Sequence, residues 1–140
     1  RVLYAEHALD STRPYPGAVE ALTQLAHLPM AVISNKPAQA TRAILHALHL
    51  SPHFRTVAGG DSFEEMKPSP LPLRRIMEQL DAEAAGTWMI GDSVYDIEAG
   101  KAAGVRTMAV TWGFQSSETL KALKPDRIVS AFDEIVDMLR

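Results

Sequence analysis

The sequence predicts an α/β domain with a mainly parallel β-sheet, and three observations lead to this fold class. The chain has 140 residues, 46% of them hydrophobic and 22% charged, which suits one domain with a sizeable core. Short apolar runs of strand length recur along it, each bounded by Gly, Pro or polar residues. Longer segments with helical spacing lie between these runs. Strands that alternate with helices are typical of a parallel sheet covered by helices.

The individual elements follow from these patterns. The apolar runs that predict strands are MAVIS (30–34), RTVAG (55–59), TWMIG (87–91), TMAVT (107–111) and RIVS (127–130). Helical spacing predicts helices over 18–28, 39–50, 71–80, 95–103 and 131–139. We also expect a short helix in residues 1–10, ahead of the turn RPYPG (13–17).

Composition excludes several classes of function. The net charge of −3 argues against a broad nucleic-acid-binding surface. The chain has no cysteine, which excludes disulfides, thiol catalysis and zinc–thiolate sites and fits a cytoplasmic protein. No apolar run approaches the ~20 residues of a membrane span, so we expect no membrane contact. The first residue is Arg rather than Met, without a signal-peptide pattern, which hints at residues missing upstream.

Polar residues that follow the strands are the first candidates for a site, because ligands of parallel α/β sheets bind at the carboxyl ends of strands. Asp92 follows the third apolar run, and Asp96 lies about one helical turn further on. Carboxylates in this arrangement suit Mg²⁺, which is usually held by one or two of them and several waters. The alternative is structural, with Asp92 as a helix cap and Asp96 as a first-turn acid favoured by the helix dipole.

Two further residues suggest phosphate binding. Ser34 follows a strand and precedes a predicted helix that begins near Pro37, so its hydroxyl and the nearby N–H groups could cradle a phosphate. The alternative is a plain N-cap serine. Lys67 lies in MKPSP, where two prolines stiffen the chain and could fix the lysine charge towards a phosphate. The alternative is a solvated surface lysine.

Together the order and spacing of these motifs are more specific. A strand followed by Ser-Asn-Lys, then Lys-Pro-x-Pro, then a strand followed by Gly-Asp-Ser-x-x-Asp resembles the haloacid dehalogenase (HAD) superfamily, and most of all its phosphoglycolate phosphatase-like branch. The stretches PYPGAVEALTQL (14–25), AAGVRTMAVTWGF (102–114) and KPDRIVSAFDEI (124–135) agree with that branch. The resemblance implies a Rossmann-like three-layer sandwich.

The resemblance also implies roles for particular residues. Ser34 would bind the phosphoryl group, with Asn35 as a weaker candidate beside it, and Lys67 would neutralise the phosphate charge. Asp92 would ligate Mg²⁺, and Asp96 would belong to the metal shell or support the lysine. The implied substrate is a small phosphorylated metabolite.

One motif of the superfamily is absent. Its chemistry begins on the first strand, in an Asp-x-Asp motif whose first aspartate attacks phosphorus, and no such pair follows an apolar run in this sequence. We therefore expect a HAD-type core that lacks its first, central strand. Residues 1–12 are expected to end a helix of the cap domain and residues 13–140 to form the partial core. A missing N-terminal segment or another chain could donate the central strand.

The functional expectation follows from this pattern. The longer parent would be a Mg²⁺-dependent phosphatase that works through an aspartyl-phosphate intermediate, whereas this chain alone would be inactive. A non-catalytic core that binds phosphate or a partner is one alternative. A related HAD hydrolase, such as a dehalogenase, or a phosphosugar mutase is the other.

Overall fold

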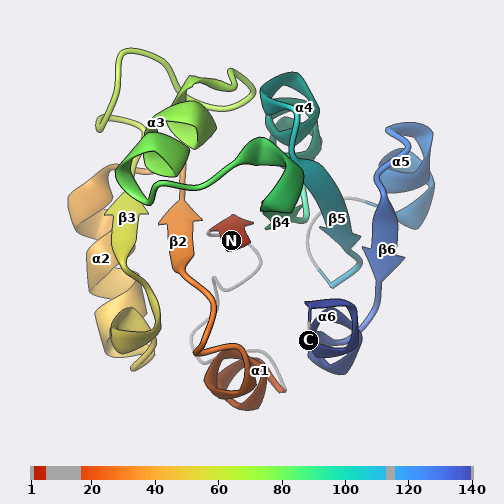
Figure 1. Ribbon diagram of the computed structural model, residues 1–140, viewed down its shortest axis with the longest axis horizontal. Helices are drawn as coiled ribbons and strands as arrows, with labels where there is room; N and C mark the ends of the chain where they lie inside the picture. The colour runs from red at the N-terminus through yellow and green to blue at the C-terminus, as the bar shows by residue number, and fades with distance from the viewer. Residues whose placement is uncertain (1, 6–16, 113–115, 140) are drawn as a thin grey trace.

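Six parallel strands form one sheet at the centre of the molecule (Figure 1). The computed structural model describes residues 2–5, 17–112 and 116–139. The strand order across the sheet is β3-β2-β1-β4-β5-β6. The strands are β1 (Val2–Ala5), β2 (Met30–Ile33), β3 (Thr56–Ala58), β4 (Trp88–Gly91), β5 (Arg106–Val110) and β6 (Arg127–Val129). The predicted α/β class with a mainly parallel sheet is confirmed, and so are the five strands expected from apolar runs.

Helices cover both faces of the sheet. They are α1 (Ala18–Gln24), α2 (Ala38–Ala47), α3 (Leu71–Gln79), α4 (Val94–Ala103), α5 (Ser117–Ala122) and α6 (Phe132–Leu139), with short 3-10 helices η2 (Ser51–His53) and η3 (Ala84–Gly86). In Figure 1, α1 and α6 lie on one side of the sheet, and α3 and α4 lie on the other. The sequence did not predict α5, a short helix that begins where the Ser116 hydroxyl accepts the N–H of Thr119.

Alternate residues of the buried strands supply the two larger cores, one on each face of the sheet. On β2, Met30 and Val32 join the core beneath α1 and α6, whereas Ala31 and Ile33 join the core beneath α3 and α4. This alternation follows from the period of two in a strand. A strand buried on both faces needs a continuous apolar run, which explains the MAVI sequence of β2.

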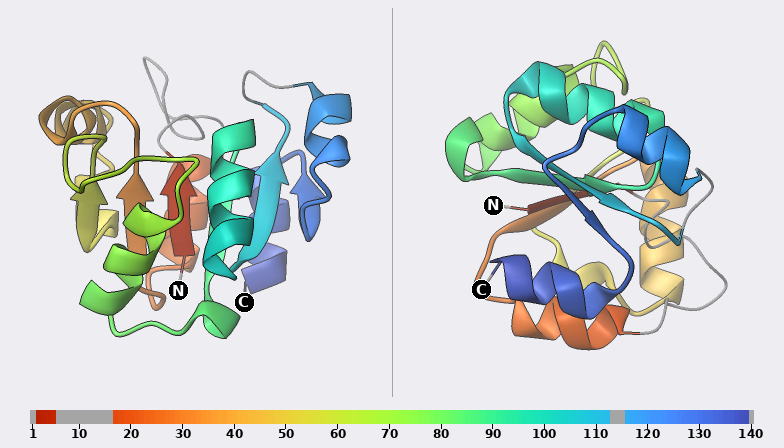
Figure 2. Two further views of the ribbon diagram at one scale, coloured as in Figure 1. Left: turned by 90° about the horizontal axis from the view of Figure 1, so that it is seen from above. Right: turned by 90° about the vertical axis from the view of Figure 1, so that its right-hand side faces the viewer.

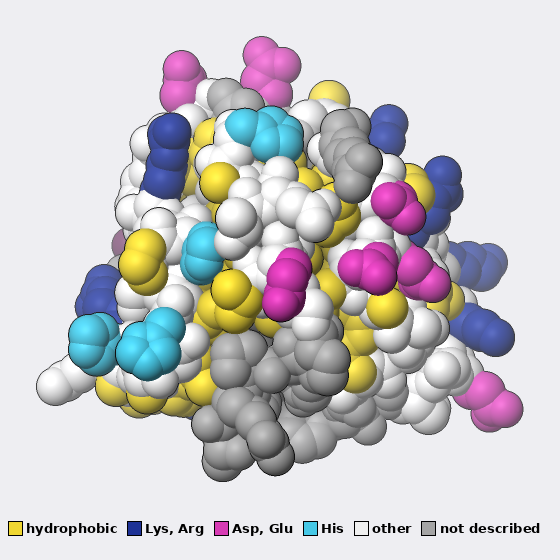
Figure 3. Space-filling view, turned by 90° about the horizontal axis from the view of Figure 1, so that it is seen from below, with side chains coloured by type: hydrophobic (Ala, Val, Ile, Leu, Met, Phe, Trp, Pro, Cys, Tyr) yellow, Lys and Arg dark blue, Asp and Glu magenta, His cyan; other side chains and the backbone are white. Residues whose placement is uncertain are grey.

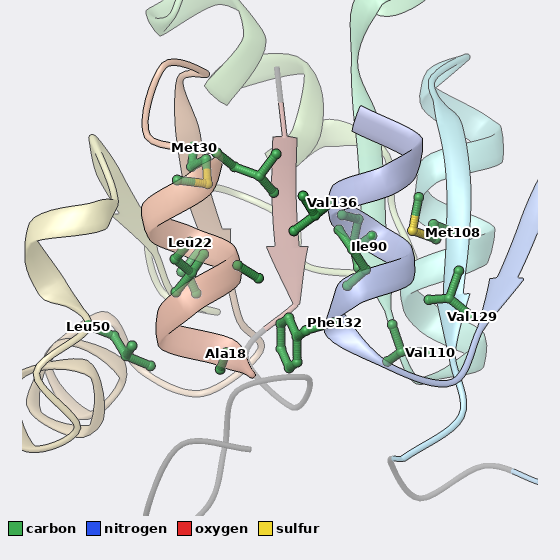
Figure 4. Packing of buried hydrophobic residues seen from close by; sticks show 14 of the residues in the cluster. Ala18, Leu22, Met30, Leu50, Ile90, Met108, Val110, Val129, Phe132 and Val136 are labelled. Carbon is green, nitrogen blue, oxygen red and sulfur yellow. The ribbon is translucent and has the colours of Figure 1, made fainter. Parts of the chain in front are cut away.

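The larger core lies between the sheet and the pair α1 and α6. Leu22 of α1, Val136 of α6 and Ile90 of β4 belong to this cluster, and Figure 4 shows Val136 beside Ile90. Phe132 adds a ring contact to Trp112, with centroids 4.8 Å apart. The outer surface on this side carries hydrophobic, acidic, basic and histidine side chains (Figure 3), so the described part of this face has charges of both signs.

The centre of the sheet differs from the sequence-based expectation. We expected residues 1–12 to end a cap-domain helix and the central place between β2 and β4 to lack its strand. Val2–Ala5 instead form β1, which is parallel to β2 and to β4 and pairs with both. The helix prediction is therefore wrong for these four residues, and residue 1 and residues 6–12 lie outside the described part of the chain.

Backbone hydrogen bonding gives the physical reason. An open slot would leave buried N–H and C=O groups on β2 and β4 without partners, at about 1–3 kcal/mol for each group. A strand in the slot satisfies both neighbours, with Leu3 opposite Ala31 on one side and Met89 on the other. The sequence VLYA also suits a strand, because Val and Tyr have high β propensity.

The sheet direction fixes where a site can form. All strands run the same way, so their carboxyl ends meet at one edge, at the top of the left panel of Figure 2. The loops that follow β2 and β4 leave the sheet at this edge, next to the central strand. Among the described residues, no helix combines the length and apolar character needed to cross a membrane.

Candidate functional site

Three segments that are distant in sequence meet at the carboxyl edge of the sheet. They are the loop after β2 with Ser34 and Asn35, the loop before α3 with Lys67, and the turn from β4 into α4 with Asp92 and Asp96. The structure therefore brings all five predicted site residues together.

Burial separates these residues from ordinary surface groups. Lys67 is 5% exposed, Asp92 1% and Asp96 0%. Lys and Asp are almost never buried this deeply unless they are paired or bind a ligand. The alternative of a solvated surface lysine at position 67 is therefore excluded.

Lys67 and Asp96 form a buried ion pair. The Lys67 ammonium lies 2.6 Å from Oδ1 of Asp96, and both side chains are nearly inaccessible to solvent. The same ammonium donates a hydrogen bond to the Ile33 carbonyl at 2.9 Å. Since Ile33 is the last residue of β2, this bond fixes the charge at the end of a central strand, immediately before Ser34.

Asp96 also organises the first turn of α4. Its Oδ2 accepts the N–H of Asp92 at 3.2 Å, the N–H of Ser93 at 3.1 Å and the Ser93 hydroxyl at 2.9 Å. The Ser93 hydroxyl in turn accepts the N–H of Asp96, which completes a capping box. A carboxylate can accept about four hydrogen bonds, so these three bonds and the one from Lys67 occupy all the acceptor positions of Asp96.

Gly91 makes room for this arrangement. A Cβ built on Gly91 would lie only 2.4 Å from Oδ2 of Asp96. Only glycine lets the last residue of β4 approach the carboxylate so closely.

Asp92 lies at the start of the same turn, but its side chain does not cap α4. It follows β4 directly and is buried at the carboxyl edge, whereas the N-cap of α4 is Ser93. The cap role that was the alternative for Asp92 therefore belongs to its neighbour. Asp92 contributes hard carboxylate oxygens, the ligand type that Mg²⁺ prefers. Across residues 2–5, 17–112 and 116–139 no group of three or more His, Cys, Asp or Glu side chains is placed to hold a metal.

Ser34 organises the loop after β2. Its N–H donates to the Ala58 carbonyl at 2.9 Å, and its Oγ accepts the N–H of Lys36 at 2.9 Å. The N-cap of α2 is Pro37, so Ser34 is not the cap that the structural alternative required. Its hydroxyl lies at the site edge, one residue after the carbonyl that binds the Lys67 ammonium.

Asn35 contacts the backbone of Lys67 with both ends of its side-chain amide. Nδ2 donates to the Lys67 carbonyl at 2.9 Å, and Oδ1 accepts the Lys67 N–H at 3.1 Å. The two described bonds join segments 32 residues apart in the sequence. They are made to protein backbone, and phosphate binding by Asn35 stays a prediction.

Sequence analysis did not predict the part played by the GGD segment, residues 59–61. Asp61 Oδ1 accepts the N–H of Ala38 at 2.9 Å and so caps α2, whose own N-cap Pro37 makes no side-chain cap bond. Gly60 donates its N–H to the Lys36 carbonyl at 2.8 Å. A Cβ on Gly59 would lie 2.1 Å from the backbone nitrogen of Ala38, and one on Gly60 would lie 2.3 Å from the backbone carbonyl oxygen of Asn35. The paired glycines were the available signal, because both positions need close backbone approach.

A parallel α/β sheet with a buried lysine, a serine and two aspartates at its carboxyl edge defines a class of α/β proteins that bind ligands at that edge. The sequence matches the haloacid dehalogenase-like hydrolase family over residues 2–110, and the chain belongs to this family. Two curated relatives are similar over nearly the whole chain, and both are named phosphoglycolate phosphatase. The one from Neisseria gonorrhoeae is 41% identical, covering 98% of this chain and 60% of the relative. The one from Aquifex aeolicus is 36% identical, covering 97% and 63%.

A solved structure agrees with this assignment. A crystal structure of a protein from Haemophilus somnus, described as a predicted phosphoglycolate phosphatase, superposes with a TM-score of 0.87. It is 30% identical in sequence, and the match covers 91% of this chain and 58% of that one. This chain thus spans about three fifths of the length of the proteins it resembles.

Proposed function

We propose that this chain forms the phosphate- and metal-binding part of a Mg²⁺-dependent phosphatase that hydrolyses a small phosphomonoester of the phosphoglycolate type. The observation that carries the proposal is the buried Lys67–Asp96 pair beside Ser34 at the carboxyl edge of the sheet. Burying an ammonium group costs free energy unless an opposite charge and hydrogen bonds compensate it. A buried lysine at the edge of a sheet is therefore a candidate functional group. The names of the relatives support the substrate class.

The lysine would act directly on the phosphoryl group. An ammonium has three N–H donors, and among the described residues Asp96 and Ile33 take two of them. The third N–H would bind a phosphoryl oxygen, and the Ser34 hydroxyl would bind another. Both groups stabilise the charge of the transferring phosphoryl group. Asp96 would serve the lysine rather than a metal, because its oxygens already accept hydrogen bonds from protein groups.

Asp92 fits the role of a Mg²⁺ ligand. Its buried carboxylate stands at the sheet edge next to the lysine pair, and its hard oxygens match the preference of this ion. When bound, Mg²⁺ neutralises phosphate charge. One carboxylate makes an incomplete site, so the other protein ligands would come from residues outside the described part of the chain.

The nucleophile would come from a segment outside these 140 residues, because the sequence holds no Asp-x-Asp motif after an apolar run. A carboxylate oxygen of that segment would form a bond to phosphorus while the ester P–O bond breaks. The departing alkoxide would take a proton from the second aspartate of the Asp-x-Asp motif. Water would then attack the phosphorus of the aspartyl phosphate and give a proton to the second aspartate, while the P–O bond to the first aspartate breaks and releases inorganic phosphate.

The second candidate is a non-catalytic core that binds phosphate or a partner, favoured by the missing nucleophile. A phosphosugar mutase or another HAD hydrolase remains a third. A cytoplasmic location stays a prediction.

Product analysis separates these candidates. The protein is extended upstream to the length of its relatives and assayed with 2-phosphoglycolate and Mg²⁺, with a sugar phosphate as comparison. We expect release of inorganic phosphate from 2-phosphoglycolate, and near-complete loss in Asp92→Asn together with weaker Mg²⁺ binding. An isomerised sugar phosphate as the main product would replace the phosphatase proposal by a mutase, and no turnover at all would favour the non-catalytic core.

A further inference from the structure

The position of the Lys67 ammonium depends on more than its ion pair. A lysine side chain has four flexible methylene groups, so an acceptor at its tip does not by itself determine where the charge sits. The backbone from which the side chain starts must also be fixed. Lys67 lies in the segment between β3 and α3, outside any helix or strand.

Asn35 supplies that constraint. Its amide makes the 2.9 Å and 3.1 Å bonds to the carbonyl and the N–H of Lys67, so both peptide groups flanking the Lys67 Cα are held by one side chain. Two bonds to the same residue restrict rotation as well as distance, as neighbouring bonds do in a β ladder. The start and the tip of the lysine are thus both anchored to the end of β2, at Asn35 and at the Ile33 carbonyl.

The loop that carries Asn35 is itself held firmly. Gly60 donates its N–H to the carbonyl of Lys36, the residue after Asn35, and packs so closely that a Cβ on Gly60 would lie 2.3 Å from the backbone carbonyl oxygen of Asn35. The Ser34 hydroxyl bonds to the Lys36 N–H on the other side of Asn35. A rigid loop is what allows a side chain to position a residue 32 places away.

We propose that Asn35 is a positioning residue that sets the location of the Lys67 ammonium, and that it does not act as a phosphate ligand. Its effect on catalysis rests on the function proposed above. Its effect on Lys67 does not, because the contacts concern this chain alone.

The first test observes the lysine directly. In ¹⁵N-labelled chain, the Lys67 ammonium should give a resolved NMR signal because it is buried and hydrogen-bonded; its loss in Lys67→Met assigns it. We expect Asn35→Ala to shift or broaden this signal. Asn35→Asp keeps the acceptor for the Lys67 N–H but places an oxygen against the Lys67 carbonyl, so it should also shift or broaden the signal. If the alanine variant does not fold, the aspartate variant decides the test.

Asp126 provides a matched control. Its Oδ2 accepts the Thr107 N–H at 2.7 Å and its own N–H donates to the Thr107 hydroxyl, so it also clamps two distant segments, but away from the site. Asp126→Ala should leave the Lys67 signal unchanged. An unchanged Lys67 signal in folded Asn35→Ala or Asn35→Asp, or an equal change in Asp126→Ala, would overturn the proposal.

The second test measures turnover in the upstream-extended protein. A misplaced charge should lower kcat by about ten- to a hundredfold in Asn35→Ala, while KM changes little. A raised KM with unchanged kcat would indicate a phosphate ligand and would contradict the positioning role. If the wild-type protein shows no turnover but Asn35→Ala displaces the lysine signal, the proposed function fails and the positioning of Lys67 by Asn35 stands.

Discussion

At the scale of single residues, the Lys67–Asp96 pair joins the start of α4 to the carboxyl edge of the sheet. One carboxylate compensates a buried ammonium through Oδ1 and closes the first turn of α4 through Oδ2. The same contacts that stabilise the helix start therefore hold a positive charge at the sheet edge. Substitutions of Lys67 and of Asp96 test these two roles separately.

The first concerns Lys67→Met in the upstream-extended protein. Methionine keeps much of the volume but removes the charge that would face the transferring phosphoryl group. By analogy with the loss of one oxyanion donor, kcat should fall by roughly 10²–10³. Steady-state kinetics with 2-phosphoglycolate measures this, and a loss below about threefold would mean that the lysine has no part in the chemistry.

The second concerns Asp96→Ala in the 140-residue chain. Removing one partner of a buried pair leaves an uncompensated charge, which costs about 3–5 kcal/mol of unfolding free energy. Urea denaturation measures the change. Asp96→Asn serves as a control that retains one acceptor for the capping box and should lose less stability. Equal unfolding free energies of Asp96→Ala and the wild type would show that the Lys67–Asp96 ion pair does not form in solution.

At the scale of elements, the loop from Gly59 to Ser62 substitutes for a capping residue that α2 lacks. Proline at the N-cap has no side-chain acceptor, and Asp61 reaches across from the loop after β3 to bind the Ala38 N–H. The Ser62 hydroxyl accepts the Gly59 N–H at 2.8 Å and tightens that loop. The start of α2, the Ser34 loop and the loop after β3 thus form one unit at the site edge.

Asp61→Ala tests this unit. Losing a helix-capping acceptor should reduce the unfolding free energy by about 0.5–2 kcal/mol, while Asp61→Asn, which keeps an oxygen, should lose only a fraction of that. Thermal or urea unfolding of both variants is the measurement. Identical losses in the two variants would mean that the bond to Ala38 contributes nothing.

At the scale of the whole molecule, the segment that fills the central place of the sheet bears on the proposed catalysis. In the fold that the sequence resembles, the nucleophile strand belongs between β2 and β4, and here Val2–Ala5 occupy that place without an aspartate. We expect the 140-residue chain alone to show no Mg²⁺-dependent hydrolysis of p-nitrophenyl phosphate. Turnover by the purified chain that disappears in Lys67→Met would contradict this.

A second prediction at this scale follows from competition for one place in the sheet. If the upstream-extended protein carries the nucleophile strand, that strand and β1 cannot both lie between β2 and β4. Amides of Val2–Ala5 should be protected from hydrogen exchange in the 140-residue chain, where β1 is paired on both sides. In the extended protein their protection should change while that of β2 and β4 persists. Unchanged protection of all three segments would show that β1 keeps its central place.

Features that depend on local pattern could be predicted from the sequence alone. Strands buried on both faces have continuous apolar sequences, so β2 and β4 could be predicted from their apolar runs. In a parallel sheet, the residues that follow such strands lie at one edge. Motif order then indicated Ser34, Lys67, Asp92 and Asp96. Tertiary structure decided what these residues do. The bonds from Asn35 to Lys67 and from Asp61 to Ala38 join segments 32 and 23 residues apart, and no periodicity encodes such partners. The role of Val2–Ala5 also depends on tertiary structure, because the strand gives β2 and β4 hydrogen-bond partners, whereas a helix had been predicted for residues 1–10.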